Sequence, residues 1–167
     1  MSGPTVPAGN GSAKQYGNVS RETLKSVQGL ELLQGMIDGR YPGPPIAELM
    51  DFAVTELGPG RAVFVGHPSR KHYNPSGTVH GGYAATLLDS AMGCAVHTLV
   101  PKGQGFTTLE IKVNYVRPMF DNTGEVRCEA AVINMGKTVA TADGKILDGK
   151  GRLVAHGTTT CLIFAIP

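Results

Sequence analysis

Hydrophobic and polar positions predict a helical N-terminal region that ends at a proline-rich connector. Over residues 20–38, apolar side chains recur at the spacing of an amphipathic helix. Ser20 suits the N-cap of this helix, and Gly39 suits its C-terminal end. The stretch 42–45 predicts an extended connector, and residues 46–50 suit one further helical turn. The apolar stripe of the first helix consists of Leu24, Val27, Leu30, Leu33, Met36 and Ile37.

The rest of the chain predicts strands on either side of one long helix. Residues 81–99 are apolar around the whole circumference of a helix, so we expect this helix to be buried. Alternation is cleanest over residues 106–117, where one face of a strand would carry Leu109, Ile111, Val113 and Tyr115. The expected strands cover residues 52–57, 61–66, 106–117, 124–135, 137–147 and 152–164.

This order of elements predicts the α+β fold class. A helix, two strands, a buried helix and four strands do not alternate as βαβ units do. The natural packing is an antiparallel sheet curled around the apolar helix. We expect residues 1–18 to form a flexible tail, residues 19–45 a helical extension and residues 46–167 a single domain.

Composition narrows the classes of partner. Charged residues make up only 17% of the 167 residues, which suggests that part of the surface is hidden in an oligomer. A net charge of +2 does not point to nucleic acid or to an anionic membrane. The N-terminus lacks the apolar core of a secretory signal, and no apolar run reaches bilayer length.

Cysteine and histidine spacing favours a reducing cytoplasm and predicts no metal site. The cysteines are odd in number, widely spaced and surrounded by apolar residues, so we expect buried free thiols at Cys94, Cys128 and Cys161. No metal-ligand spacing links His67, His72, His97 and His156.

The candidate chemistry centres on Asp89, the only formal charge between Lys71 and Lys102. A carboxylate inside an apolar helix is costly to desolvate unless it is paired, protonated or used. Gly81 and Gly82 open the same helix, whose free backbone N–H groups could stabilise an oxyanion. The alternatives are that the glycines serve only close packing and that Asp89 only bonds to nearby hydroxyl or backbone groups.

The candidate set also contains two residues that precede the glycines in the sequence. His80 directly precedes Gly81, and Asn74 could orient a carbonyl or a water molecule. Asp89 lies eight residues after Gly81, or ~12 Å along a helix. Both groups can act on one carbonyl only if two subunits bring them together across a symmetric dimer interface.

The pattern Asn74-x5-His80-Gly81-Gly82-x6-Asp89-x3-Gly93, followed by the strand Thr107–Pro118, resembles the PaaI-like acyl-CoA thioesterases of the hotdog superfamily. The resemblance continues through residues 136–142 and 151–157. It implies a hotdog fold, homodimers with a continuous sheet, often homotetramers, and two interface sites per dimer. The substrate would be an acyl-CoA, so that CoA belongs to the substrate and no separate cofactor is expected.

The resemblance also implies roles for individual residues. Asp89 would be the general base or nucleophile, and the Gly81 amide the oxyanion donor. His80 and Asn74 would orient the thioester and the attacking water. Thr107 matches a position where relatives place a hydroxyl near the carboxylate, and a shift of one residue would give that role to the adjacent Thr108.

Substrate-binding residues are assigned by position. The CoA phosphates would bind exposed cations, for which the candidates are Lys137, Arg117 and Arg152. The acyl group would enter a pocket that could be lined by Leu49, Met50, Phe52 and Leu88, residues that would equally suit a plain core.

Two other functions remain open at this stage. A hotdog hydratase or dehydratase would need a proton-shuttling histidine paired with an acid. His80 and Asp89 would have to form this pair, but the context of Asn74 and Gly81-Gly82 favours hydrolysis. A non-catalytic acyl-CoA-binding protein on the same fold would have no use for the Asp89 carboxylate. We therefore expect hydrolysis of an acyl-CoA or aroyl-CoA thioester, because a thiol departs without a strong general acid.

Overall fold

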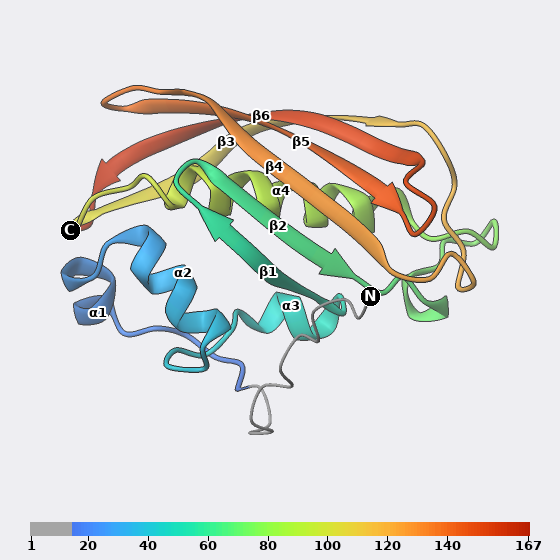
Figure 1. Ribbon diagram of the computed structural model, residues 1–167, viewed down its shortest axis with the longest axis horizontal. Coiled ribbons are helices and arrows are strands. Elements are labelled where there is room, and N and C mark those ends of the chain that lie inside the picture. The colour runs from blue at the N-terminus through green and yellow to red at the C-terminus, as the bar shows by residue number, and fades with distance from the viewer. Residues whose placement is uncertain (1–14) are drawn as a thin grey trace, which may run out of the picture.

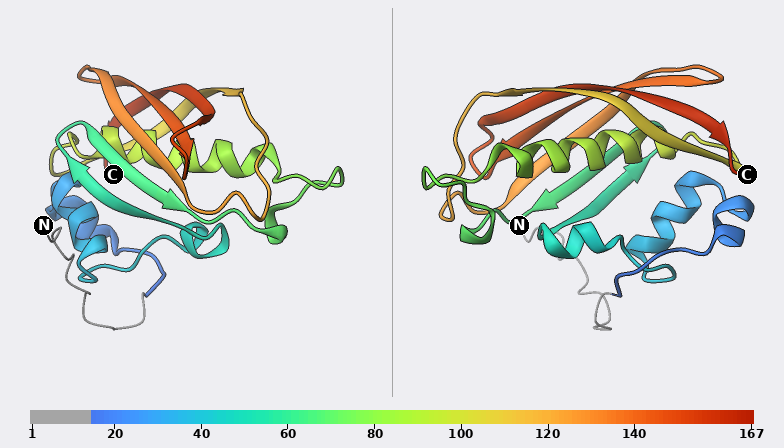
Figure 2. Two further views of the ribbon diagram at one scale, coloured as in Figure 1. Left: turned by 45° about the vertical axis from the view of Figure 1, so that its right-hand side comes forward. Right: turned by 180° about the vertical axis from the view of Figure 1, so that it is seen from behind.

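A long helix, α4 (Gly81–His97), lies along the concave side of a six-stranded antiparallel sheet (Figure 1 and Figure 2). The computed structural model describes residues 15–167. The sheet order is β1-β2-β4-β5-β6-β3, which leaves β1 and β3 at its edges. The strands are β1 (Phe52–Gly58), β2 (Arg61–Gly66), β3 (Gln104–Tyr115), β4 (Val126–Met135), β5 (Val139–Asp148) and β6 (Leu153–Ala165). The predicted α+β fold class, with a sheet wrapped around a buried helix, is confirmed.

Glycines on the inner face of the sheet allow α4 to approach closely. Gly144 of β5 pairs with Gly157 of β6 at the centre of the sheet. A Cβ atom added at Gly144 would lie 3.0 Å from the Met92 side chain and 3.2 Å from that of Leu88. Larger residues at this point would push α4 away from the sheet and change where Asp89 lies.

Both ends of α4 are fixed by local hydrogen bonds. His80 is the N-cap and accepts a hydrogen bond from the Gly82 N–H. At the other end the Thr98 hydroxyl donates to the Ala95 carbonyl (2.6 Å) and accepts from the Gly60 N–H in the β1–β2 turn (2.8 Å). These contacts hold the helix in register with the sheet.

The N-terminal extension differs from the prediction of one helix over residues 20–38. It contains α1 (Arg21–Ser26) and α2 (Gly29–Ile37), separated by extended backbone at Val27 and Gln28. Ser20 caps α1 as expected, and Gly39 follows α2 with φ of +77°. The break has a tertiary cause, because the Gly29 N–H donates to the Val100 carbonyl beyond the end of α4.

The segment before α1 is partly ordered. Gln15 and Gly17 form backbone hydrogen bonds with Gly43 in the proline-rich connector, at 2.9 Å each. These bonds connect residues 15–17 to the connector. The flexible tail was predicted for residues 1–18, and residues 1–14 of it lie outside the described residues. After the connector comes α3 (Pro45–Leu49), which matches the expected helical turn.

A β-bulge in β3 changes which side chains face α4. The register of β3 against β6 shifts between Thr108 and Glu110, so that Leu109 has no direct partner. Leu109 is 59% exposed, although alternation predicted that it shares a face with Ile111 and Val113. The extra residue places Thr108 on the inner face instead.

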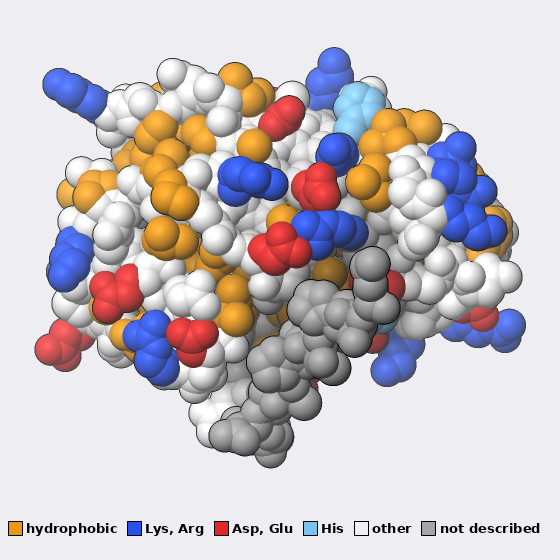
Figure 3. All heavy atoms as spheres, in the orientation of Figure 1, with side chains coloured by type: hydrophobic (Ala, Val, Ile, Leu, Met, Phe, Trp, Pro, Cys, Tyr) orange, Lys and Arg blue, Asp and Glu red, His pale blue; other side chains and the backbone are white. Residues whose placement is uncertain are grey.

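Charged side chains of both signs are mixed on the face that Figure 3 shows. Ion pairs join strands of the sheet: Arg127 of β4 pairs with Glu56 of β1 across β2, and Lys145 of β5 pairs with Glu129 of the neighbouring β4. Among residues 15–167, no helix is both long and apolar enough to span a bilayer.

Candidate active site

The N-terminus of α4 presents one free backbone donor. The Gly82 N–H donates to His80 Nδ1 (2.8 Å), and the Tyr83 N–H donates to the His80 carbonyl (2.9 Å). No acceptor within residues 15–167 is hydrogen-bonded to the Gly81 N–H. The expected oxyanion donor is therefore the amide that remains available.

His80 has a structural task beside this amide. Its Nδ1 accepts a hydrogen bond, so in the neutral ring the proton resides on Nε2. The His80 N–H also donates to the His72 carbonyl (2.7 Å), which ties the start of α4 to the preceding loop. Only Nε2 is left to contact a substrate.

Asn74 is folded back onto its own loop. Its Oδ1 accepts hydrogen bonds from the N–H groups of Ser76 (2.9 Å) and Thr78 (3.3 Å), and its Nδ2 donates to the Thr78 hydroxyl (2.9 Å). The second hydrogen of Nδ2 is left for another acceptor. Asn74 thus shapes the loop that leads to α4, and one donor remains for the predicted role.

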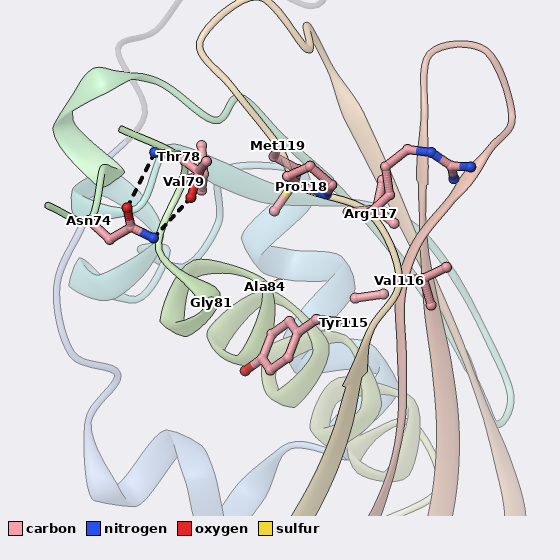
Figure 4. Close-up of a pocket in the computed structure, with 12 residues that line it drawn as sticks. Asn74, Thr78, Val79, Gly81, Ala84, Tyr115, Val116, Arg117, Pro118 and Met119 are labelled. Carbon is pink, nitrogen blue, oxygen red and sulfur yellow. Dashed lines mark hydrogen bonds between the residues drawn. The ribbon is translucent and has the colours of Figure 1, made fainter. Parts of the chain in front are cut away.

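A cavity of about 310 Å³ opens at Gly81 (Figure 4). One wall is the loop that carries Asn74, Thr78 and Val79, and the opposite wall is the segment Val116–Met119. Gly81 and Ala84 of α4 form the floor, and Tyr115 lies over the first turns of the helix. The free Gly81 N–H therefore belongs to a lined pocket.

Tyr115 explains why residue 81 is a glycine. A Cβ atom at Gly81 would lie 3.1 Å from the Tyr115 ring, closer than most real side-chain contacts. The alternation of β3 predicted that Tyr115 shares the face of Val113, yet gave no sign that its ring would reach the helix N-terminus. This contact depends on how β3 crosses α4, which no local pattern encodes.

Asp89 lies half-buried in the middle of α4, without an opposite charge. No ion pair in the described part of the chain includes it. Its Oδ1 accepts a hydrogen bond from the Thr108 hydroxyl at 2.8 Å. Asp89 does not line the cavity at Gly81, which agrees with a separation of ~12 Å along the helix.

The hydroxyl beside the carboxylate belongs to Thr108, so the assignment of this position to Thr107 is corrected. Thr107 is exposed on the opposite face of β3. The cause is the bulge at Leu109, which shifts the alternation by one residue.

Two titratable groups in the C-terminal half of α4 are uncharged at neutral pH. Burial raises the pKa of the Cys94 thiol to about 12, and the negative charge of Asp89 adds to this shift. Burial lowers the pKa of His97 to about 4. Neither group can act as a thiolate or as an imidazolium beside the carboxylate.

Of the three predicted phosphate-binding cations, Lys137 lies apart from the other two within one chain. The Arg152 guanidinium is paired with Asp148, which also accepts the backbone N–H groups of residues 150 and 152. Arg117 donates to the Leu153 carbonyl (2.5 Å) and is directed away from Gly81 (Figure 4). Lys137 precedes Val139, which pairs with Leu162 at the far end of β6.

The predicted acyl-pocket residues are also divided. Phe52 and Leu88 are buried in the core, Met50 is half-buried, and Leu49 is exposed on α3. They do not line the cavity at Gly81, whose apolar lining includes Val79, Ala84 and Met119 together with Val154 near the start of β6.

A long helix held inside a curved antiparallel sheet defines the hotdog fold, and comparison with known proteins supplies the family. A family model described as the thioesterase superfamily matches residues 76–155. A mutant of the phenylacetic acid degradation protein PaaI from Thermus thermophilus has a TM-score of 0.64 and 32% identity, covering 71% of this chain and 97% of that one. The chain belongs to the thioesterase superfamily, in its PaaI-like group.

Curated relatives support this placement. A protein assigned as an esterase in Saccharolobus solfataricus is 32% identical over 111 residues, which is 66% of this chain and 76% of the relative. Human acyl-coenzyme A thioesterase 13 is 29% identical over 104 residues, 61% of this chain and 72% of the relative. At 38% and 35% identity, the chain spans about half the length of two relatives from Halobacterium salinarum and Caenorhabditis elegans.

Proposed function

We propose that this protein hydrolyses acyl-CoA thioesters to a free acid and CoA. The observation that carries the proposal is the Asp89 carboxylate, which lies half-buried, has no ionic partner among residues 15–167 and accepts a hydrogen bond from Thr108. The free Gly81 N–H supplies the second element that acyl transfer needs. The names of relatives agree, since one is an acyl-coenzyme A thioesterase.

The reaction follows from these two groups. Thr108 donates to Oδ1 of Asp89, so Oδ2 is free to take a proton from a water molecule as the water attacks the thioester carbonyl. The carbonyl oxygen becomes an oxyanion that accepts a hydrogen bond from the Gly81 N–H. Collapse of this intermediate breaks the C–S bond, and the thiolate takes the proton from Asp89. Direct attack by Asp89 would instead give a mixed anhydride, which water then hydrolyses.

The two groups act together in a dimer. Asp89 and Gly81 of one chain lie ~12 Å apart along α4, too far to contact the same carbonyl. The edge strand β3 carries the exposed apolar residues Leu109 and Tyr115, and the exposed Val116 directly follows it. Pairing of two β3 edges around a twofold axis would cover them and bring each Asp89 to the Gly81 of the partner subunit.

The phosphates of CoA would meet Arg117 more readily than Arg152. Arg152 is neutralised by Asp148, whereas Arg117 contacts only a backbone carbonyl among the residues described and lines the Gly81 cavity. Lys137 could take part only if the assembly brings the far end of β6 near another subunit.

A panel of acyl-CoAs, assayed by release of free thiol, tests the proposal. We expect Asp89→Asn to lower kcat at least ~100-fold with the fold intact, as typical of a lost general base. Asp143→Asn, on the exposed outer face of β5, is the matched control. Near-wild-type turnover by Asp89→Asn would refute the assignment, and enoyl-CoA hydration without thiol release would identify a hydratase instead.

A further inference from the structure

The exposed Arg70 and Asp121 and the half-buried Tyr73 join two loops that are far apart in the sequence. The Arg70 Nε–H donates to Asp121 Oδ2 (2.7 Å), and the Tyr73 hydroxyl donates to Asp121 Oδ1 (2.9 Å). The same hydroxyl accepts the Asp121 backbone N–H (2.9 Å). Tyr73 and Asp121 therefore form a reciprocal pair that fixes both the ring and the loop, and we refer to the three residues as the Asp121 clamp.

The clamp lies just outside the two walls of the Gly81 cavity. Tyr73 directly precedes the wall that contains Asn74, Thr78 and Val79, and Asp121 follows the wall Val116–Met119. Deeper in the structure, the Val79 N–H donates to the Met119 carbonyl (2.9 Å) and joins the same walls. The width of the cavity is thus set by contacts at its inner and outer margins.

The clamp is charged but exposed. Hydrogen bonds from Arg70 and then Tyr73 hold the pKa of the Asp121 carboxyl below its usual range, so it is ionised at neutral pH. Exposed ion pairs contribute little to the global stability of a protein. Loss of the clamp is therefore expected to loosen the two loops locally while the rest of the fold persists.

We propose that Asp121 is a positioning residue that holds the substrate-binding walls of the Gly81 cavity at a fixed separation. The proposal rests on the proposed thioesterase function. Gly81 itself is carried by α4, whose N-terminus is fixed by His80, so the oxyanion donor stays in place when the walls loosen. The clamp thus acts on substrate binding in the ground and transition states alike, and its loss raises KM while kcat changes little.

The test compares Asp121→Ala, Asp121→Asn and Tyr73→Phe with the wild-type protein. We expect Asp121→Ala and Tyr73→Phe to raise KM about tenfold, with kcat within about twofold and an unchanged melting temperature. Asp121→Asn keeps an acceptor oxygen for the Tyr73 hydroxyl, and the backbone N–H of residue 121 can still donate to that hydroxyl, so it should restore most of the wild-type KM. Glu56→Gln neutralises an exposed partner of Arg127 on the sheet and serves as the control, with no expected change in KM.

Hydrogen exchange provides a readout that does not depend on turnover. Asp121→Ala should speed amide exchange over residues 74–79, and Glu56→Gln should not. An unchanged KM in Asp121→Ala, or no rescue by Asp121→Asn, would overturn the proposal.

Failure of the proposed function can be told apart from failure of the clamp. If the wild-type protein releases no thiol but binds a thioether analogue of phenylacetyl-CoA, thioester hydrolysis is refuted and the clamp is judged by the dissociation constant. In that case Asp121→Ala must weaken binding about tenfold for the clamp to stand. A wild-type protein that neither releases thiol nor binds the analogue would refute both the proposed function and the proposed role of the clamp.

Discussion

The two oxygens of the Asp89 carboxylate are not equivalent, because Oδ1 alone accepts the Thr108 hydroxyl. A hydrogen bond to a charged acceptor fixes the rotation of the carboxylate and leaves Oδ2 for the water molecule of the proposed reaction. The apolar helix around Asp89 is visible in the sequence, as are the glycines at its start. The identity of the threonine is not, because a single bulge reverses the alternation of β3.

Substitution of the two adjacent threonines tests this arrangement. We expect Thr108→Val to lower kcat by about 10- to 100-fold, because hydrogen bonds to charged groups contribute roughly 1.5–3 kcal/mol. Thr107→Val changes an exposed side chain and should leave kcat within about twofold. Steady-state kinetics of both variants measure these changes. Equal losses of kcat in the two variants would show that the Thr108 hydroxyl does not assist Asp89.

At the scale of elements, the C-terminal end of α4 is the meeting point of three segments. The ring of His97 packs at a tilt of 45° against Phe106 of β3, with ring centroids 5.1 Å apart. Gly29 at the start of α2 lies so close to His97 that a Cβ atom there would overlap the His97 carbonyl and ring. The sequence predicted a helix in this extension, but it could not show the break at Val27 and Gln28. That break follows from docking onto Val100, a contact between residues about seventy positions apart.

Burial of His97 predicts a pH-dependent stability. Its pKa is lowered by desolvation from 6.5 to about 4, so between these values the unfolded chain binds a proton that the folded protein does not. The contribution to stability is complete above pH 6.5 and is lost as the pH falls toward 4. The slope for one proton is at most about 1.4 kcal/mol per pH unit.

Urea unfolding of the wild-type protein and of His97→Leu at a fixed protein concentration measures this contribution. The variant should show a shallower fall in the free energy of unfolding between pH 6.5 and 4, whatever its stability at pH 7. Parallel profiles for the two proteins would mean that His97 is protonated in the folded state.

At the scale of the whole molecule, the sequence predicted a site shared by two subunits, which a single chain cannot contain. Helix rise alone separates Asp89 from Gly81 by ~12 Å, and the structure adds an edge strand with exposed apolar side chains. The cations were the least predictable part, because the role of each depends on its partner. Arg152 is held by Asp148 in a turn, and nothing in its local sequence distinguishes it from Arg117.

Complementation between two inactive variants tests the shared site directly. Gly81→Pro removes the free N–H at the first helical position, which tolerates proline. Gly81→Ala keeps that N–H while it brings a similar Cβ atom toward Tyr115.

Asp89→Asn and Gly81→Pro are co-expressed with different affinity tags, and the mixed dimer is purified through both. One of its sites combines both substitutions, whereas the other combines an intact Asp89 with an intact Gly81. The mixed dimer should therefore show about half of the wild-type thiol release, although each variant alone is nearly inactive. A site built within one chain would give no recovery, because each subunit carries a substitution. Gly81→Ala, assayed alone, should retain clearly more activity than Gly81→Pro; equal losses would assign the effect to the Tyr115 contact rather than to the missing donor.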